Sequence, residues 1–312
     1  MRSIRNMLHS SYKTSRPVAI IFLTLTAILW SFGGLLIKSV EWNSFAIAGS
    51  RSIIASLFIL AILGWKPKIT WSFPQFAGAL AYSLTVISFV AATRMTTAAN
   101  AILLQYSAPI FVAIFGSWFL NEKVKLSDWI TIFFVLAGMI LFFLDEINMN
   151  NMLGNLIAIF SGVTFAATAV FMRKQKSDSS IESVLLGNIA TFIICLPFMF
   201  KSGPGVKGWM ILVILGIFQL GLSYVLYSIA IKGVTALEAT LIPVLEPLLN
   251  PFWVFLFKGE TPGKWALIGG LIVLISVTVN CVITSVKNSE EAKAKATYDL
   301  PETVVPKDSV SK

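Results

Sequence analysis

The chain alternates between long apolar stretches and short connections that hold most of its charges. An α-helix needs about 20 apolar residues to span the hydrocarbon core of a bilayer, so each stretch of that length predicts a membrane-spanning helix. We expect ten spans, at residues 18–37, 43–63, 72–93, 97–119, 126–144, 152–172, 181–200, 208–231, 236–257 and 264–285. The fifth has a short uncharged run, because Asp128 limits it to residues 129–144.

The ninth span contains a carboxylate and three prolines. Glu246 lies near its middle, close to Pro243, Pro247 and Pro251. Each proline lacks a backbone N–H and leaves a carbonyl one turn earlier without its helical partner. A carboxylate at that depth is costly unless it faces protein or a water-filled cavity. This span therefore predicts a polar core in the middle of the membrane.

The fourth span repeats the plan of the ninth. Residues 97–119 read TAANAILLQYSAPIFVAIFGSWF, and residues 235–257 read TALEATLIPVLEPLLNPFWVFLF. When the two are aligned, threonine, alanine, leucine and proline recur at matching positions, and Glu122 corresponds to Glu260. The chain is therefore predicted to be built twice around the polar core. At the start of the ninth span, Thr235 and Glu238 have the spacing of a helix-capping box.

Composition and charge agree with a membrane protein. Hydrophobic residues make up 56% of the chain and charged residues 12%, whereas a soluble domain has about 25% charged residues. Lysine and arginine concentrate at the two ends of the chain and in connections that follow even-numbered spans. Basic residues favour the cytoplasmic side, so both termini are expected there and the two repeats run in opposite directions. This placement accounts for the net charge of +9 without a nucleic-acid partner.

Other spans contain polar and aromatic candidates for a cavity wall. Trp30 lies near the outer end of the first span, where a role as interfacial anchor competes with contact to substrate. Arg51 lies roughly 12 Å along the second span, and we favour a structural or gating role for it over substrate contact. On the eighth span, Gln219, Ser223 and Tyr227 recur every four residues and share one face of the helix.

Several of these segments resemble a known family. FAIAGSRSIIASLFIL in the second span, TTAANAILLQYSAPIF…LNEK in one half and GVTALEATLIPVLEPLLNPF…KGE in the other are similar to the EamA-like branch of the drug/metabolite transporter superfamily. The resemblance covers residues 18–285. It implies an all-α integral membrane protein with ten helices in a 5+5 inverted repeat, around a central cavity that opens alternately to each side.

The resemblance also sets the expected boundaries and motif. The first five-helix repeat is expected at 18–144 and the second at 145–285, between a cytoplasmic segment at 1–17 and a disordered cytoplasmic tail at 286–312. The family's LEP motif corresponds to Leu245, Glu246 and Pro247. Its counterpart in the first half is Ser-Ala-Pro at 107–109, so this chain has no paired carboxylate.

The expected function is secondary transport of a small polar metabolite across the cytoplasmic membrane, with efflux of an amino acid or related compound as the leading version. Uptake of a choline-like cation or a vitamin is the alternative, and a non-transporting membrane scaffold is the alternative from another class. An enzyme is not expected: the sole histidine, His9, precedes the first span, so a Ser-His protease and an HExxH zinc site both lack parts. No Walker A loop occurs, so ATP-driven transport by this chain alone is not expected. We expect no cofactor and no metal, and either a monomer or a homodimer.

The predicted cavity wall combines aromatic rings, amides and one carboxylate, which suits a small zwitterionic or cationic metabolite. Its members are Trp30, Tyr82, Gln105, Tyr106, Gln219, Tyr224, Tyr227, Glu246 and Asn250. Opening of the cavity would change the hydration of Glu246 and therefore its protonation, which is the physical requirement for coupling transport to protons. The competing interpretation is that Glu246 only braces the backbone around the prolines.

Overall fold

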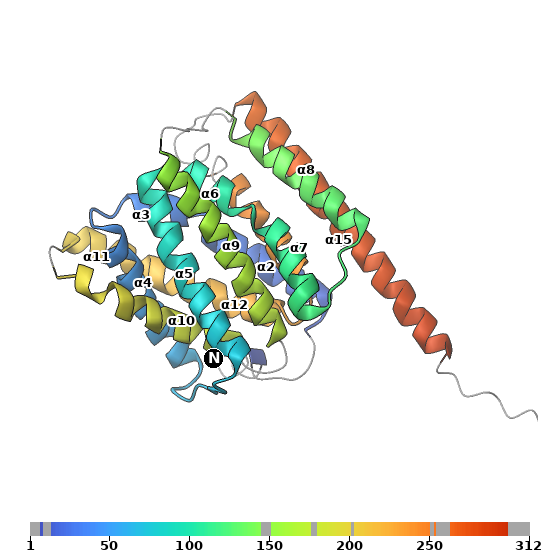
Figure 1. Ribbon diagram of the computed structural model, residues 1–312, viewed down its shortest axis with the longest axis horizontal. Helices are drawn as coiled ribbons and strands as arrows, with labels where there is room; N and C mark the ends of the chain where they lie inside the picture. The colour runs from blue at the N-terminus through green and yellow to red at the C-terminus, as the bar shows by residue number, and fades with distance from the viewer. Residues whose placement is uncertain are drawn as a thin grey trace, which may run out of the picture.

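The structure is a computed structural model that describes residues 7–8, 14–144, 151–175, 180–200, 203–249, 253 and 263–298, the side chains only up to residue 286. Regular structure in these residues is entirely helical (Figure 1). The first half contains α2 (Arg16–Trp30), α3 (Gly33–Lys38), α4 (Ser44–Ile62), α5 (Phe73–Met95), α6 (Ala98–Gln105), α7 (Ala108–Leu120) and α8 (Leu126–Phe142). The second half contains α9 (Met152–Lys174), α10 (Ser180–Cys195), η1 (Leu196–Phe198), α11 (Gly205–Ile214), η2 (Leu215–Leu222), α12 (Ser223–Ala230), α13 (Ala236–Leu241), η3 (Ile242–Val244) and α15 (Lys264–Tyr298).

Eight helical stretches in the described residues are long and apolar enough to cross a membrane, and α8 is a shorter apolar helix. Four of them join consecutive elements: α2 with α3, α6 with α7, α10 with η1, and α11 with η2 and α12. The predicted ninth span begins with α13 and η3 and is helical again at 245–249. Most of its remainder lies outside the described residues, so the predicted count of ten stays a prediction.

Side-chain caps explain where several helices begin. Asn43 accepts a hydrogen bond from the Ala46 N–H at 2.8 Å, before α4. Thr235 and Glu238 form the predicted capping box of α13, each side chain accepting from the backbone N–H of the other residue. These contacts satisfy N–H groups that have no partner within the helix, so the polar residues at span ends fix the boundaries.

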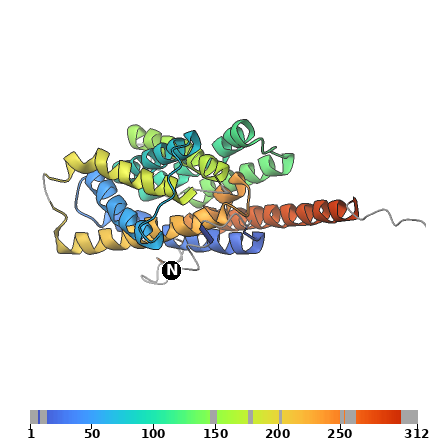
Figure 2. The ribbon, with the colours of Figure 1, turned by 90° about the horizontal axis from the view of Figure 1, so that it is seen from below.

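The two halves exchange contacts reciprocally. The third span of each half packs on the first span of the other, as α5 lies along α9 and α12 along α2. The second span of each half packs on the third span of the other, since α4 contacts η2 and α10 contacts α5. The last spans, α8 and α15, run side by side at one edge (Figures 1 and 2). A two-fold relation between repeats produces this pattern, and it brings residues from both halves to one centre.

The last helix is longer than the sequence predicts. It runs to Tyr298 and extends beyond the rest of the bundle (Figure 2), whereas the sequence predicts a disordered tail from residue 286. The segment EEAKAKA at 290–296 consists of strong helix formers. These residues can continue an existing helix without burying apolar surface. Residues 299–312 lie outside the described part of the chain.

Candidate functional site: a polar cavity at the interruptions of four spans

Four spans depart from regular α-helix near the centre of the molecule. The first span turns between α2 and α3 at Ser31 and Phe32, and the fourth turns between α6 and α7 at Tyr106 and Ser107. The eighth contains the π-helical segment η2, and the ninth contains the 3₁₀ segment η3. In transporters, helices interrupted in this way expose polar backbone where it lines a cavity.

Local chemistry accounts for the two interruptions that contain proline. Pro109 lies in the first turn of α7 and Pro243 in η3, and neither residue has an N–H to continue a helix. At the first of these breaks, the Ser107 hydroxyl donates to the Leu104 carbonyl at 2.7 Å. This bond satisfies a carbonyl near the break, as polar side chains inside a membrane commonly do.

The π segment is held against α4 by glycines. A Cβ on Gly216 would lie 2.6 Å from the Ile54 Cβ and 2.8 Å from the Arg51 carbonyl oxygen. Only glycine therefore fits this approach without displacing backbone. The close approach brings Gln219 of η2 to α4, where its Oε1 accepts a hydrogen bond from Arg51 Nη1 at 3.0 Å.

A cavity lies between these interruptions, with a water-accessible volume of about 40 Å³. Six predicted site residues line it: Trp30, Gln105, Tyr106, Gln219, Tyr224 and Glu246. Six further residues complete the wall: Arg51, Thr85, Val86, Phe89, Phe165 and Leu220. The cavity therefore joins a deep carboxylate, one guanidinium, two amides and an aromatic cluster.

Glu246 is bonded to the phenol of Tyr106. The Tyr106 oxygen lies 2.8 Å from Glu246 Oε2 and 2.6 Å from the Pro243 carbonyl oxygen. A phenol has one hydrogen, so it cannot donate fully to both acceptors. When Glu246 is protonated, its carboxyl can donate to the phenol while the phenol donates to Pro243. The geometry therefore accommodates a protonated Glu246.

The aromatic side of the cavity is built around Trp30. Its ring centroid lies 5.7 Å from that of Phe165 and 5.2 Å from that of Tyr224, and its Nε1 donates to Ser223 Oγ at 2.9 Å. An amide of the cavity wall is also held in place, since Gln105 Nε2 donates to Ser161 Oγ at 2.8 Å. The rings present a rigid apolar wall, because Trp30 is fixed at its polar end.

Two predicted site residues lie behind the wall. Tyr82 and Tyr227 are both fully buried; the Tyr82 ring packs against Tyr224, with centroids 4.7 Å apart. The Tyr82 hydroxyl accepts from Asn188 Nδ2 at 2.9 Å. These tyrosines support Tyr224 and do not line the cavity in this conformation. The last predicted residue, Asn250, lies outside the described residues.

Arg51 is the cavity residue for which the sequence argument favoured another role. A charge in an otherwise apolar span marks Arg51 as unusual. The position of Arg51 along the span does not show which neighbouring helix its side chain faces. Phe165, Thr85, Val86, Phe89 and Leu220 were missed because ordinary apolar residues and a single threonine have no distinguishing pattern in a membrane span.

Comparison with known proteins assigns the family. The model of the EamA-like transporter family matches residues 17–144 and 152–282, as two successive copies that cover most of the chain. The chain belongs to the EamA-like transporter family. Together with its apolar helices, membership identifies a multi-pass membrane protein of the drug/metabolite transporter superfamily.

Relatives of this EamA-like protein are named as transporters. An uncharacterized transporter of Archaeoglobus fulgidus is 28% identical over 197 residues, covering 63% of this chain and 72% of that protein. Solute carrier family 35 member G1 of Mus musculus is 26% identical, with coverage of 84% and 77%. Pseudopaline exporter CntI of Pseudomonas aeruginosa is 20% identical, with coverage of 88% and 89%.

A solved structure shares the fold of this EamA-like protein. A crystal structure that is 17% identical superposes with a TM-score of 0.73, over 86% of this chain and 98% of that one. At this identity the likeness shows the fold alone. It indicates that the helical arrangement around the cavity recurs in a distant protein.

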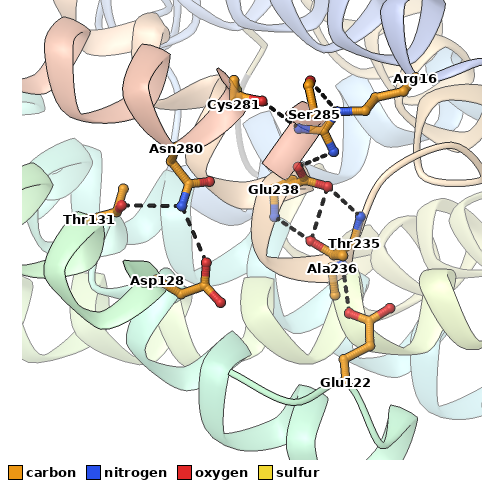
Figure 3. A network of polar contacts seen from close by, with 10 residues as sticks. All are labelled: Arg16, Glu122, Asp128, Thr131, Thr235, Ala236, Glu238, Asn280, Cys281 and Ser285. Atoms are coloured by element: carbon orange, nitrogen blue, oxygen red, sulfur yellow. Dashed lines mark hydrogen bonds and ion pairs between the residues drawn. The ribbon is translucent and has the colours of Figure 1, made fainter. Parts of the chain in front are cut away.

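At one end of the EamA-like bundle, a network of polar side chains connects several spans (Figure 3). Arg16 forms an ion pair with Glu238 at 2.5 Å and donates to Ser285 Oγ and to the Cys281 carbonyl, both at 3.0 Å. It thereby ties the start of the first span to the ninth and tenth. Nearby, Asn280 Nδ2 donates to Asp128 Oδ1 at 3.3 Å, which joins α15 to α8.

A second ion pair at the same end joins the fourth span to the sixth. Arg173 Nε pairs with Glu122 Oε1 at 3.0 Å, and Arg173 Nη1 donates to the Ile231 carbonyl at 2.8 Å. The other oxygen of Glu122 accepts from the Ala236 N–H at 3.1 Å. Glu122, from the repeated motif, therefore connects α7, α9 and α13 where the sequence predicts the cytoplasmic surface.

Proposed function

We propose that the chain is a secondary transporter that exports a small zwitterionic metabolite, an amino acid or a related compound, by alternating access. The observation that carries this proposal is the central cavity, in which both halves contribute polar groups at interrupted helices. Inverted-repeat transporters bind their substrates at such places near the midplane. A membrane scaffold needs neither a deep carboxylate nor a polar cavity.

The size of the cavity supports a closed state of the transporter. About 40 Å³ of water-accessible volume holds few waters, since one water needs roughly 10–15 Å³ by the same measure. An amino acid needs more room, so transport requires the spans to separate. The ion pairs of Arg16 and Arg173 close the end that the sequence predicts to be cytoplasmic, and their release opens the cavity toward the metabolite pool.

Glu246 is the proposed coupling residue. It is 6% exposed, and its contact with Tyr106 accommodates a proton, so a change in hydration on opening would change its protonation. The cavity would then bind a proton and the substrate in turn, so that proton entry drives export. The direction of transport draws support from one relative, whose name describes an exporter of pseudopaline.

Uptake of a choline-like cation is the second candidate, and the aromatic cluster favours it. Trp30, Phe165 and Tyr224 stand on the same cavity as Glu246, and rings beside a carboxylate can hold a quaternary ammonium by cation–π contact. A bare cation would meet the guanidinium of Arg51 on the same wall. That repulsion makes the cation the less favoured substrate.

Release of labelled compounds from proteoliposomes tests the function. Vesicles containing the purified protein are loaded with radiolabelled amino acids or with choline, and protein-dependent release is followed. We expect saturable amino-acid release that falls at least several-fold in Gln219→Ala and Tyr224→Ala, with folded yield near that of wild type. Phe133→Ala is the matched control, because Phe133 is 66% exposed on α8 and touches no part of the cavity.

Two outcomes would contradict the proposal. If no amino acid is released faster than from protein-free vesicles, the export proposal fails. If choline alone is released, the second candidate replaces it. Tyr82→Ala is unsuitable for this test, because the Tyr82 ring packs against Gly187, on which a Cβ would lie 2.6 Å from the tyrosine Cδ1, and its removal would empty a packed site.

A further inference from the structure

Arg51 is a buried cation without an anionic partner in the described part of the chain. It is 1% exposed and lies midway along α4. Its Nη1 donates to the neutral amide of Gln219 at 3.0 Å, whereas its Nε is buried without a hydrogen-bond partner. Among the residues that the structure describes, no ion pair includes Arg51.

Such a charge is costly unless something else compensates it. A guanidinium stays protonated in proteins, and an unpaired buried charge or an unmade hydrogen bond to it destabilises the fold. Ionisable residues inside membrane spans usually pair with one another or face a substrate pathway. Arg51 lines the central cavity, so the missing partner can come from the compound that enters it.

Two other arginines in the bundle, both with low exposure, show what a purely structural arginine looks like here. Arg173 is 9% exposed and is satisfied by the Glu122 carboxylate and by backbone carbonyls. Arg16 likewise has a carboxylate, a hydroxyl and a carbonyl as acceptors. Arg51 has one neutral oxygen. The contrast separates Arg51 from the arginines that connect helices.

Packing of the second span of one half on the third span of the other half does not require a charge either. In the reciprocal contact of the other repeat, between α10 and α5, Asn188 and Tyr82 are bonded at 2.9 Å and both are neutral. The same helix pairing is therefore made once with a cation and once without. The guanidinium is an addition to the packing of α4 on η2, on the side that faces the cavity.

A basic and an acidic side chain, Arg51 and Glu246, line the same cavity without forming an ion pair with each other. Glu246 lines the same space as Arg51, but its described partner is the Tyr106 hydroxyl and it forms no ion pair with Arg51. We propose that Arg51 binds the carboxylate of the substrate while Glu246 faces its ammonium group. The substrate class is then an α-amino acid or a similar zwitterion, an inference that rests on the proposed transport function.

The unused edge of the guanidinium suits this role. With Nη1 engaged by Gln219, the edge formed by Nε and Nη2 can hold a carboxylate through two parallel hydrogen bonds. Nε is closed off from solvent in this conformation, so the carboxylate reaches it only when the cavity widens. Gln219 orients the guanidinium and is a positioning residue.

A competition series in proteoliposomes tests the assignment. Vesicles are preloaded with unlabelled amino acids, and entry of each radiolabelled amino acid by counterflow identifies the compounds that wild type exchanges. The best of these is then competed with itself, with its carboxamide and with the decarboxylated amine. We expect the two analogues to compete about 10- to 100-fold more weakly, the range that a charge-assisted hydrogen bond provides.

Variants assign that discrimination to Arg51. Arg51→Gln should bind the amino acid about 10- to 100-fold more weakly and no longer distinguish it from its carboxamide, and Arg51→Lys should restore part of the distinction. Arg94→Gln is the matched control, because Arg94 is exposed and contacts only backbone carbonyls at the far end of α5. It should discriminate as wild type does.

The outcomes separate this inference from the function it rests on. If wild type exchanges the carboxamide or the amine as well as the amino acid, the assignment of Arg51 is overturned while the transporter stands, and this result does not depend on any variant folding. The assignment is also overturned if Arg51→Gln exchanges with wild-type discrimination. If no compound is exchanged, the transport function itself fails and the inference falls with it.

Discussion

Tyr106 connects the only described carboxylate of the cavity to the backbone of the ninth span. Its hydroxyl contacts Glu246 Oε2 and the Pro243 carbonyl, so its removal takes one buried hydrogen-bond partner from each of these groups. Tyr106→Phe should lower the free energy of unfolding by about 1–3 kcal/mol and reduce the thermal midpoint. Tyr227→Phe is the control, because the buried Tyr227 hydroxyl has no partner among the described residues. A larger loss in Tyr227→Phe than in Tyr106→Phe would contradict the assigned contacts.

Glu246 is predicted to couple transport to protons. Glu246→Gln keeps the shape of the side chain and its hydrogen-bonding capacity but removes its titration. The variant should lose substrate accumulation driven by a pH gradient and still exchange substrate across the membrane. Both are measured in the same proteoliposomes, with and without the gradient. Driven transport that survives with its pH dependence intact would leave Glu246 with a bracing role alone.

The sequence predicts which kinds of residue form the cavity better than it predicts which side chains face into it. Glu246 could be found because a carboxylate in an apolar span needs a polar neighbour, and Tyr106 because it precedes a proline break. Tyr82 and Tyr227 were assigned to the wall, but the rotation of a helix about its axis decides which tyrosine faces inward. That rotation follows from packing against other spans, as with the Tyr82 ring against Gly187, and a single sequence does not contain it.

At the scale of elements, the π segment η2 positions Gln219, and Gly216 permits its approach to α4. A Cβ at this position would meet Ile54 and the Arg51 carbonyl, so Gly216→Ala should cost about 1–3 kcal/mol through overpacking and lower transport as well as folded yield. Gly116→Ala is the control inside α7, because nothing lies within 4 Å of the added methyl group. Thermal unfolding of both variants checks this, and equal midpoints would contradict the close approach of η2 to α4.

The sequence fixes the ends of these elements more reliably than their interruptions. Capping residues such as Asn43 and Thr235 act locally, so their patterns can be recognised. The π segment depends on glycines that meet side chains of another span, and α15 continues past residue 286 because helix formers follow the apolar stretch. The π segment leaves no local signal in the sequence, whereas the helix formers at 290–296 are a local signal that α15 continues.

For the whole molecule, the distribution of basic residues predicts that both termini are cytoplasmic. Single cysteines in place of Ser3 and Lys307 should react with a membrane-impermeant maleimide only from the cytoplasmic side. The background for this measurement replaces Cys195 and Cys281, the two native cysteines, by serine. Reaction of either introduced cysteine from outside would reverse or reject the predicted topology.

The ion pair between Arg16 and Glu238 is predicted to hold the cytoplasmic end closed. Arg16→Gln should increase several-fold the maleimide reactivity of a cysteine in place of Val112, which is 1% exposed on α7 beside this network. Lys66→Gln is the control, because Lys66 is exposed at the same predicted surface and lies in no described ion pair. Unchanged reactivity in Arg16→Gln would exclude this pair from closure.

Counterflow in proteoliposomes tests the central claim that the cavity serves a carrier. Vesicles preloaded with unlabelled amino acids are diluted into a trace of the same compounds in labelled form. If a carrier reorients with substrate bound, the vesicles should accumulate label transiently above its equilibrium level. The initial rate of label entry should saturate as the external concentration rises. Label that only reaches equilibrium at an unsaturable rate would indicate a channel, and the absence of protein-dependent entry for every amino acid tested would contradict the account.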